Sequence, residues 1–147
     1  NKDHVLERFS KMIDYKVESN IDVEEMKSTS NKDSLFELIM LRLEAMQTYK
    51  VALRNILSSA KEQPIILKKL SKNIINSLDF YLELSSYYDY TTVDFLKKNA
   101  IFFIYSLTFR VWLNDESDDL SKTMAELDKF LSMADKANEK ITSFLSV

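Results

Sequence analysis

The residues of this chain that most resemble a chemical site form an acidic run, DESDDLSKTMAE, which begins at Asp115. Counted from Asp115, positions 1, 3 and 5 are Asp, Ser and Asp and position 12 is Glu126, as in a calcium-binding loop. Position 6 of such a loop must be glycine, whereas here it is Leu120, the first residue of an apolar helical stripe. We therefore interpret the acids as capping groups of a helix that starts at about Ser117, and we predict no metal site.

Catalytic chemistry has few side chains to use. The chain contains one histidine, His4, which lies near Glu7, and no cysteine. Di-iron helical bundles need two Glu-x-x-His units, so a single histidine cannot supply that site. A Ser-His-Asp triad with His4 is formally possible, but no pattern places a serine and a carboxylate beside it. We predict a surface histidine, no cofactor and no enzymatic activity.

The composition favours an all-α fold of one domain. The 147 residues include no glycine and one proline, Pro64, and hairpins and phosphate-binding loops depend on glycine. The net charge of −3 does not suggest a nucleic-acid binder. One basic region is interpreted as solvated helix surface; it comprises Lys50, Arg54, Lys61, Lys68, Lys69 and Lys72. The apolar run 100–113 is interrupted by Arg110 and is too short to span a membrane. The absence of cysteine, and hence of disulfides, is compatible with the reducing cytoplasm.

Apolar spacing of three and four residues predicts a series of helices. Polar segments separate them at 20–33, where one turn is expected around 23–26, at 58–63 and at 85–90. Ser34 with Glu37 indicates a capping box, Pro64 suits a first helical turn, and Thr91 with Asp94 is expected to cap the helix that runs to Leu113. The predicted helices span about 2–19, 35–49, 51–57, 64–84, 93–113 and 117–145.

The last predicted helix has the clearest stripe, and the helix before it is apolar on nearly every side. A helix that is apolar all round must be buried on all sides, and the two helices offer more apolar surface than one small core absorbs. We therefore predict a homodimer with a four-helix interface around a two-fold axis. The expected interface residues are Leu120, Met124, Leu127, Leu131, Ala134 and Ile141.

Arg42 is the charged residue most open to a functional interpretation. It falls on a stripe of apolar and aromatic residues that runs from Leu35 to Tyr49, and a buried guanidinium must find an acceptor. The acceptor is either an internal carboxylate or helix-end carbonyl, which is a structural role, or the anionic head group of a ligand. Arg110 leaves the same choice open, because it can also clamp the acidic turn that follows it.

Two segments together carry a family resemblance: LFELIMLRLEAMQTYKVALRNIL in the middle of the chain and SLTFRVWLNDESDDLSKTMAELDKFL near its end. Their order resembles the C-terminal regulatory region of TetR-family transcriptional repressors, in a subgroup with a Trp-Leu pair, an acidic turn and a Thr-Met-Ala-x-Leu-Asp run. The matching residues are Trp112, Leu113, Asp115, Ser117, Thr123, Met124, Ala125, Leu127 and Asp128.

The resemblance implies a cytoplasmic bacterial regulator that dimerises through its last two helices. Residues 1–19 would form the connecting helix from an N-terminal helix-turn-helix that this chain lacks, so DNA would be bound only through that missing part. Residues 20–147 would form the ligand-binding and dimerisation domain. A small hydrophobic or amphipathic ligand is expected between helices 35–49, 64–84 and 93–113. Its expected contacts are Arg42, Met46, Tyr49, Leu70, Ile74, Leu78, Phe103, Leu107 and Arg110.

A second family shares much of this pattern. Ubiquinone-biosynthesis lipid-binding proteins have a TetR-like fold and a similar tryptophan, acidic turn and threonine, but do not act by binding DNA. Their usual Asn-Trp-Tyr-Thr-Lys-Arg stretch has no counterpart in 94–105 of this chain, where KKNAIFFIY is only loosely similar. A lipid-binding role is therefore the alternative expectation.

Overall fold

The computed structural model describes residues 2–146, with side chains from His4 onward. All regular structure in this range is helical, which confirms the predicted all-α class. Asn1 of the predicted connecting helix 1–19 and Val147 of the predicted domain 20–147 lie outside the described residues. The elements are α1 (Lys2–Ser19), α2 (Val23–Ser28), α3 (Asn31–Ala45), the short 3-10 helix η1 (Gln47–Tyr49), α4 (Lys50–Ala60), α5 (Pro64–Leu84), α6 (Val93–Asn114) and α7 (Ser121–Leu145).

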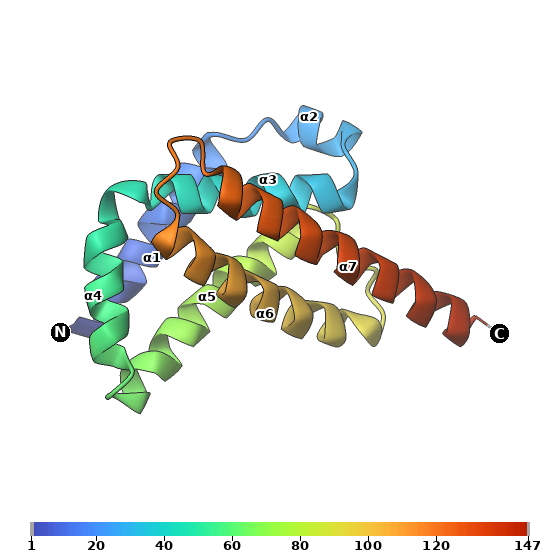
Figure 1. Cartoon of the computed structure of the whole chain (residues 1–147). Coiled ribbons are helices and arrows are strands. Elements are labelled where there is room, and N and C mark those ends of the chain that lie inside the picture. The colour runs from blue at the N-terminus through green and yellow to red at the C-terminus, as the bar shows by residue number, and fades with distance from the viewer. Residues whose placement is uncertain (1, 147) are drawn as a thin grey trace.

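Helix α3 is the centre of the fold. Four of its leucine and isoleucine side chains have no exposed surface, because α1, α5, α6 and α7 all pack against this helix. Figure 1 shows α7 running antiparallel along α6, and this pair makes the most extensive helix contact of the fold. Helix α4 packs on α5 and is set apart from the α6–α7 pair, so one side of α6 is less closely covered than the other.

The start of α3 differs from the predicted one because another side chain provides its cap. Helix α3 begins at Asn31, and Ser30 is its N-cap, accepting a hydrogen bond from the Asp33 amide. Ser34 lies inside the helix, where its hydroxyl donates to the Met26 carbonyl. The predicted capping box of Ser34 and Glu37 is therefore wrong. The start at Pro64 is confirmed, since that residue occupies the first turn of α5.

The start of α6 was predicted within a residue, but not its cap. Thr92 precedes the helix without a side-chain cap, whereas Asp94 turns back and accepts the amides of Asp89 and Tyr90. Tyr90 and Ser86 in this connection have positive φ. Asp94 thus closes the loop before α6 instead of forming the predicted cap with Thr91.

Helix α7 begins at Ser121 and not at Ser117. Leu120 precedes it in the left-handed region at φ 53°, and the Asp119 carboxylate accepts the Ser121 amide. Asp115 crosses the turn and accepts both the amide and the hydroxyl of Thr123, at 2.9 and 2.7 Å. The acids of this run do act as helix caps, as predicted, although the helix starts four residues later.

The apolar stripe of α7 packs mostly on its own chain, and the predicted dimer interface stays a prediction. Leu120, Leu127 and Leu131 are buried against the core that α3 and α6 form, and Met124 and Ala134 are half-buried against the same core. Of the predicted interface residues, Ile141 alone is exposed, at 38%. One small core absorbs this stripe because α7 crosses both α3 and α6. Ala134 and Ile141 also line the groove between α6 and α7.

Candidate functional site

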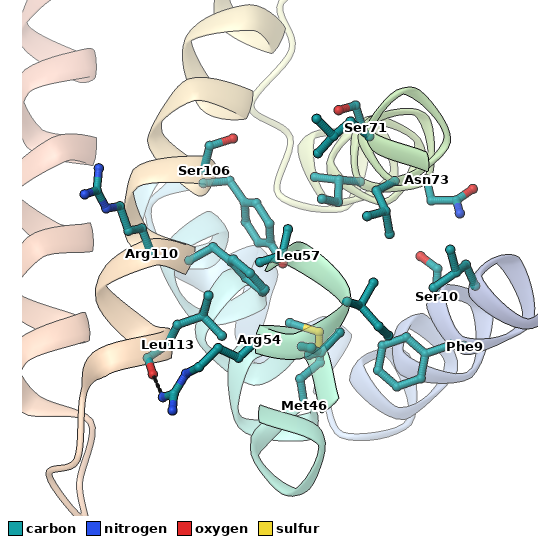
Figure 2. A pocket seen from close by; sticks show the side chains of 18 of the residues that line it. Phe9, Ser10, Met46, Arg54, Leu57, Ser71, Asn73, Ser106, Arg110 and Leu113 are labelled. Atoms are coloured by element: carbon teal, nitrogen blue, oxygen red, sulfur yellow. Dashed lines mark hydrogen bonds between the residues drawn. The ribbon is translucent and has the colours of Figure 1, made fainter. Parts of the chain in front are cut away.

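A cavity of about 600 Å³ is bordered by residues of α1, α3, α4, α5 and α6 and opens to the surface. Its floor is apolar and aromatic, because each surrounding helix turns part of an apolar stripe toward it. Figure 2 shows residues of α6 and α4 on one side of this cavity and residues of α1 and α5 on the opposite side. The apolar lining comprises Leu6, Phe9, Met46, Leu53, Ile56, Leu57, Leu67, Leu70, Ile74, Phe102, Tyr105, Phe109 and Leu113.

Arg42 is at the floor of the cavity, and its guanidinium is bound by the chain itself. The side chain is 4% exposed and forms an ion pair with Asp14 of α1, with 2.6 Å between Nη1 and Oδ1. Its Nε donates to the Tyr105 hydroxyl at 3.0 Å, and Nη1 also approaches the Tyr81 hydroxyl at 3.4 Å. Tyr81 donates in turn to Asp14 at 2.7 Å. The structural role left open by the sequence, an internal carboxylate partner, is the one that the geometry shows.

The charge state of this network follows from its contacts. Burial disfavours the Arg42 cation, but Tyr105, Tyr81 and Asp14 outweigh this effect and raise its pKa above the ordinary value. Burial also raises the pKa of Tyr81, so its hydroxyl stays protonated and can donate to Asp14. Ser77 donates to the other Asp14 oxygen at 2.6 Å. The network therefore holds α1 to α3, α5 and α6 by charge-assisted hydrogen bonds.

Two cations of α4 bind the C-terminal end of α6. The Arg54 guanidinium donates to the carbonyl of Leu113, and Figure 2 shows this bond at the edge of the cavity. Lys50 donates to the carbonyl of Asp115 at 2.9 Å and lies 4.8 Å from the centre of the Trp112 ring. Cations are favourable at the negative end of a helix dipole. These contacts hold α4 to the end of α6 at the edge of the cavity.

The structure gathers part of the predicted ligand set around this cavity. Arg42, Met46, Leu70, Ile74 and Arg110 line it. The other four predicted residues do not line it. Leu78 is buried in the hydrophobic core, and Leu107 is half-buried outside the cavity. Tyr49 packs edge-on against Phe9 with 5.1 Å between ring centres, and Phe103 is 64% exposed. Phe103 points outward because α6 turns its neighbours Phe102 and Ile104 toward the interior.

Residues of α4 and α1 that were not predicted from the sequence also line the cavity. Leu53, Ile56 and Leu57 line the cavity from α4, and Phe9 lines it from α1. Their spacing is visible in the sequence, but nothing there shows that the segment 51–57 borders a cavity. The arginine at position 54 was assigned to solvated surface, whereas it also forms the cavity edge.

Asp115 and His4, the two other groups considered for chemistry, do not form a reactive site. One Asp115 oxygen accepts from the amide and hydroxyl of Ser117, and the other accepts from Thr123. Burial opposes the Asp115 charge, but these hydrogen bonds outweigh it and hold the pKa of the carboxyl well below its ordinary value. His4 is exposed on α1. Among the described side chains, no three His, Asp or Glu residues are grouped so that they could hold a metal ion.

Residues 2–146 include no helix that is both long and apolar enough to cross a bilayer. Comparisons of the chain with protein-family models, curated proteins and solved structures find no match.

Proposed function

We propose that this chain is the effector-binding and dimerisation domain of a TetR-like transcriptional regulator. The observation that carries the proposal is the cavity of about 600 Å³ bordered by α1, α3, α4, α5 and α6, because its size falls in the range of small-molecule sites and its lining is mainly apolar. A small hydrophobic or amphipathic effector is the expected ligand. DNA binding would belong to a segment that precedes α1.

Helix α1 connects the cavity to that segment in this proposal. Ser10 and Phe9 of α1 line the cavity, and Asp14, one turn further along, holds the buried Arg42. A ligand that moves either lining residue therefore acts on the same helix that supplies the ion-pair partner of Arg42. Ligand and operator would favour different positions of α1, which is an equilibrium between two conformations.

The dimer is proposed on the outer face of α6 and α7, where the predicted residues Ala134 and Ile141 line a shallow groove. Phe103 on α6 and Met133 and Phe144 on α7 are exposed, at 64%, 58% and 82%. In the groove between the two helices, the Oδ1 atom of Asn138 is buried and accepts no hydrogen bond from any described residue. A second copy would cover the apolar side chains and could supply a donor to this acceptor.

A cavity-filling variant tests effector binding. The neutral dye N-phenylnaphthylamine should bind saturably and raise the melting temperature, because a ligand of the folded state stabilises it by mass action. Leu57→Trp fills the cavity and should abolish both effects. Val51→Trp is the matched control, since Val51 is on the exposed side of α4. Dye binding that survives Leu57→Trp would remove the cavity from the proposal.

Sedimentation velocity tests the dimer. The unmodified chain should be dimeric at micromolar concentration, and Phe103→Glu with Met133→Glu should make it monomeric while it remains folded. Ile65→Glu, which places the same charge on an exposed residue of α5, should leave the dimer intact. A monomeric unmodified chain would contradict this part of the proposal.

DNA binding separates the regulator from the lipid-binding alternative. The full gene product should bind an operator, and an effector should weaken that binding. Transfer of lipid between vesicles without any DNA binding would support the alternative instead.

A further inference from the structure

The charged side chains around the cavity all have the same sign. Four lining residues are basic, namely Arg42, Arg54, Lys61 and Arg110, and none of the described lining residues is Asp or Glu. The whole chain is nevertheless acidic, with 23 Asp and Glu against 20 Lys and Arg. The cavity therefore differs in charge from the average of the protein that surrounds it.

The basic residue at the floor does not supply this positive charge to a ligand. Arg42 is neutralised by Asp14 at 2.6 Å, and two tyrosine hydroxyls lie within hydrogen-bonding distance of its guanidinium. Breaking a buried pair of this kind leaves a charge without a partner and costs several kcal/mol. A head group at the floor would have to displace Asp14, so the open positive charge is at the rim.

The rim carries two rows of polar residues, one from the α4 side and one from α6. One row follows α4, where Arg54, Ser58 and the C-cap residue Lys61 succeed one another at helical spacing. The other row is on α6, where Ser106, Arg110 and Asn114 do the same. In Figure 2, Arg54, Ser106 and Arg110 lie on one side of the cavity, away from Ser10 and Asn73.

Two of the rim cations are not engaged elsewhere. The side chains of Arg110 and Lys61 form no hydrogen bond or ion pair with any described residue, and both are exposed. Figure 2 shows the Arg110 guanidinium directed away from the cavity, and it can turn toward a ligand without breaking a contact. Arg54 donates one bond to the Leu113 carbonyl, which fixes its position and leaves further N–H groups for a second acceptor.

We propose that the cavity takes an amphipathic anion, with its apolar body between Leu57, Ile74 and Phe109 and its anionic head held at the rim by Arg54, Arg110 and Lys61. This inference rests on the proposed effector-binding function and adds the chemical class and the orientation of the effector. A carboxylate is the simplest such head, because a guanidinium can donate two parallel hydrogen bonds to it.

Three ligands with the same alkyl chain and different heads test the charge preference. Decanoate, decanol and decyltrimethylammonium are titrated below their micelle-forming concentrations, with displacement of N-phenylnaphthylamine as the readout. Decanoate should bind about tenfold more tightly than decanol, and the cation should bind most weakly. The preference for decanoate should shrink as salt is added, because the rim is exposed.

Substitutions at the rim test the orientation. Arg110→Gln with Lys61→Gln should reduce the decanoate preference at least about threefold and leave decanol affinity unchanged. Arg54→Gln should act in the same direction, and its thermal unfolding is measured beside it because Arg54 also binds α6. Lys136→Gln, on the exposed side of α7, is the control for a general change of net charge and should have no effect.

The outcomes separate this inference from the function on which it rests. If neither the neutral dye nor any alkyl ligand binds, the effector-binding function itself is overturned. If dye and decanol bind, but decanoate is not preferred or its preference survives the double rim variant, the cavity remains a binding site and the rim assignment is overturned.

Discussion

The two sides of α6 have similar apolar sequences but different surroundings. On its buried side Ile101, Thr108 and Trp112 are covered by the core, and each polar group there has a partner, such as the Trp112 indole N–H that donates to Gln47 at 2.9 Å. On the side toward α4, Phe102 and Phe109 are half-buried and border the cavity. The difference shows that an apolar helix face supports the core where a neighbour covers it completely, and borders a cavity where the neighbour stands apart.

The largest effect is expected on the covered side. Leu127→Ala should lower the free energy of unfolding by about 3–4 kcal/mol, because Leu127 is fully buried and its removal leaves a cavity in a close-packed core. Leu57→Ala should cost only about 1 kcal/mol, since its side chain already borders open space. Urea unfolding of both variants measures the contrast. Equal losses would mean that the two sides are packed alike.

The next effect is at the boundary between the two sides, where Arg42 forms the cavity floor. Arg42→Met should cost about 3 kcal/mol, because it leaves the Asp14 carboxylate without its cation. Adding Asp14→Asn to this variant should recover part of the loss, and a double-mutant cycle in urea measures the coupling. A double variant no more stable than Arg42→Met would show that the ion pair contributes little.

The smallest effect concerns the turn that joins α6 to α7. Asp115→Asn should lower the free energy of unfolding by about 1–2 kcal/mol at neutral pH, because Ser117 and Thr123 lose a charged acceptor. The folded state depresses the Asp115 pKa from its ordinary 3.8, so its contribution is present above that pH and is lost as the pH falls.

Unfolding measured as a function of pH checks this sign. The unmodified chain should lose stability between about pH 5 and pH 2, and the Asp115→Asn variant should lose less over the same interval. Asp118→Asn is the control, because Asp118 is exposed in the same acidic run and no described residue bonds to its carboxylate. Identical pH profiles for all three proteins would contradict the assignment of this pKa.

The sequence was sufficient for the local features of the fold. The absence of glycine and the three- and four-residue spacing predicted an all-helical chain, and the Pro64 start was confirmed. These features depend on neighbours in the sequence. The Ser30 cap and the loop-closing role of Asp94 were not predicted, because several nearby polar side chains compete for the same amides and tertiary packing selects among them.

The candidate site was predicted only in part, for a physical reason that Leu131 and Arg42 illustrate. Amphipathic spacing shows that Leu131 will be covered, but not whether its own chain or a second subunit covers it, since the hydrophobic effect is not directional. Likewise the sequence required an acceptor for Arg42, and only the tertiary structure brought Asp14 of α1 within 2.6 Å. The sequence by itself determined which residues must be buried or paired. The packing of α1, α4 and α7 around α3 and α6 decided their partners and left the cavity beside α4.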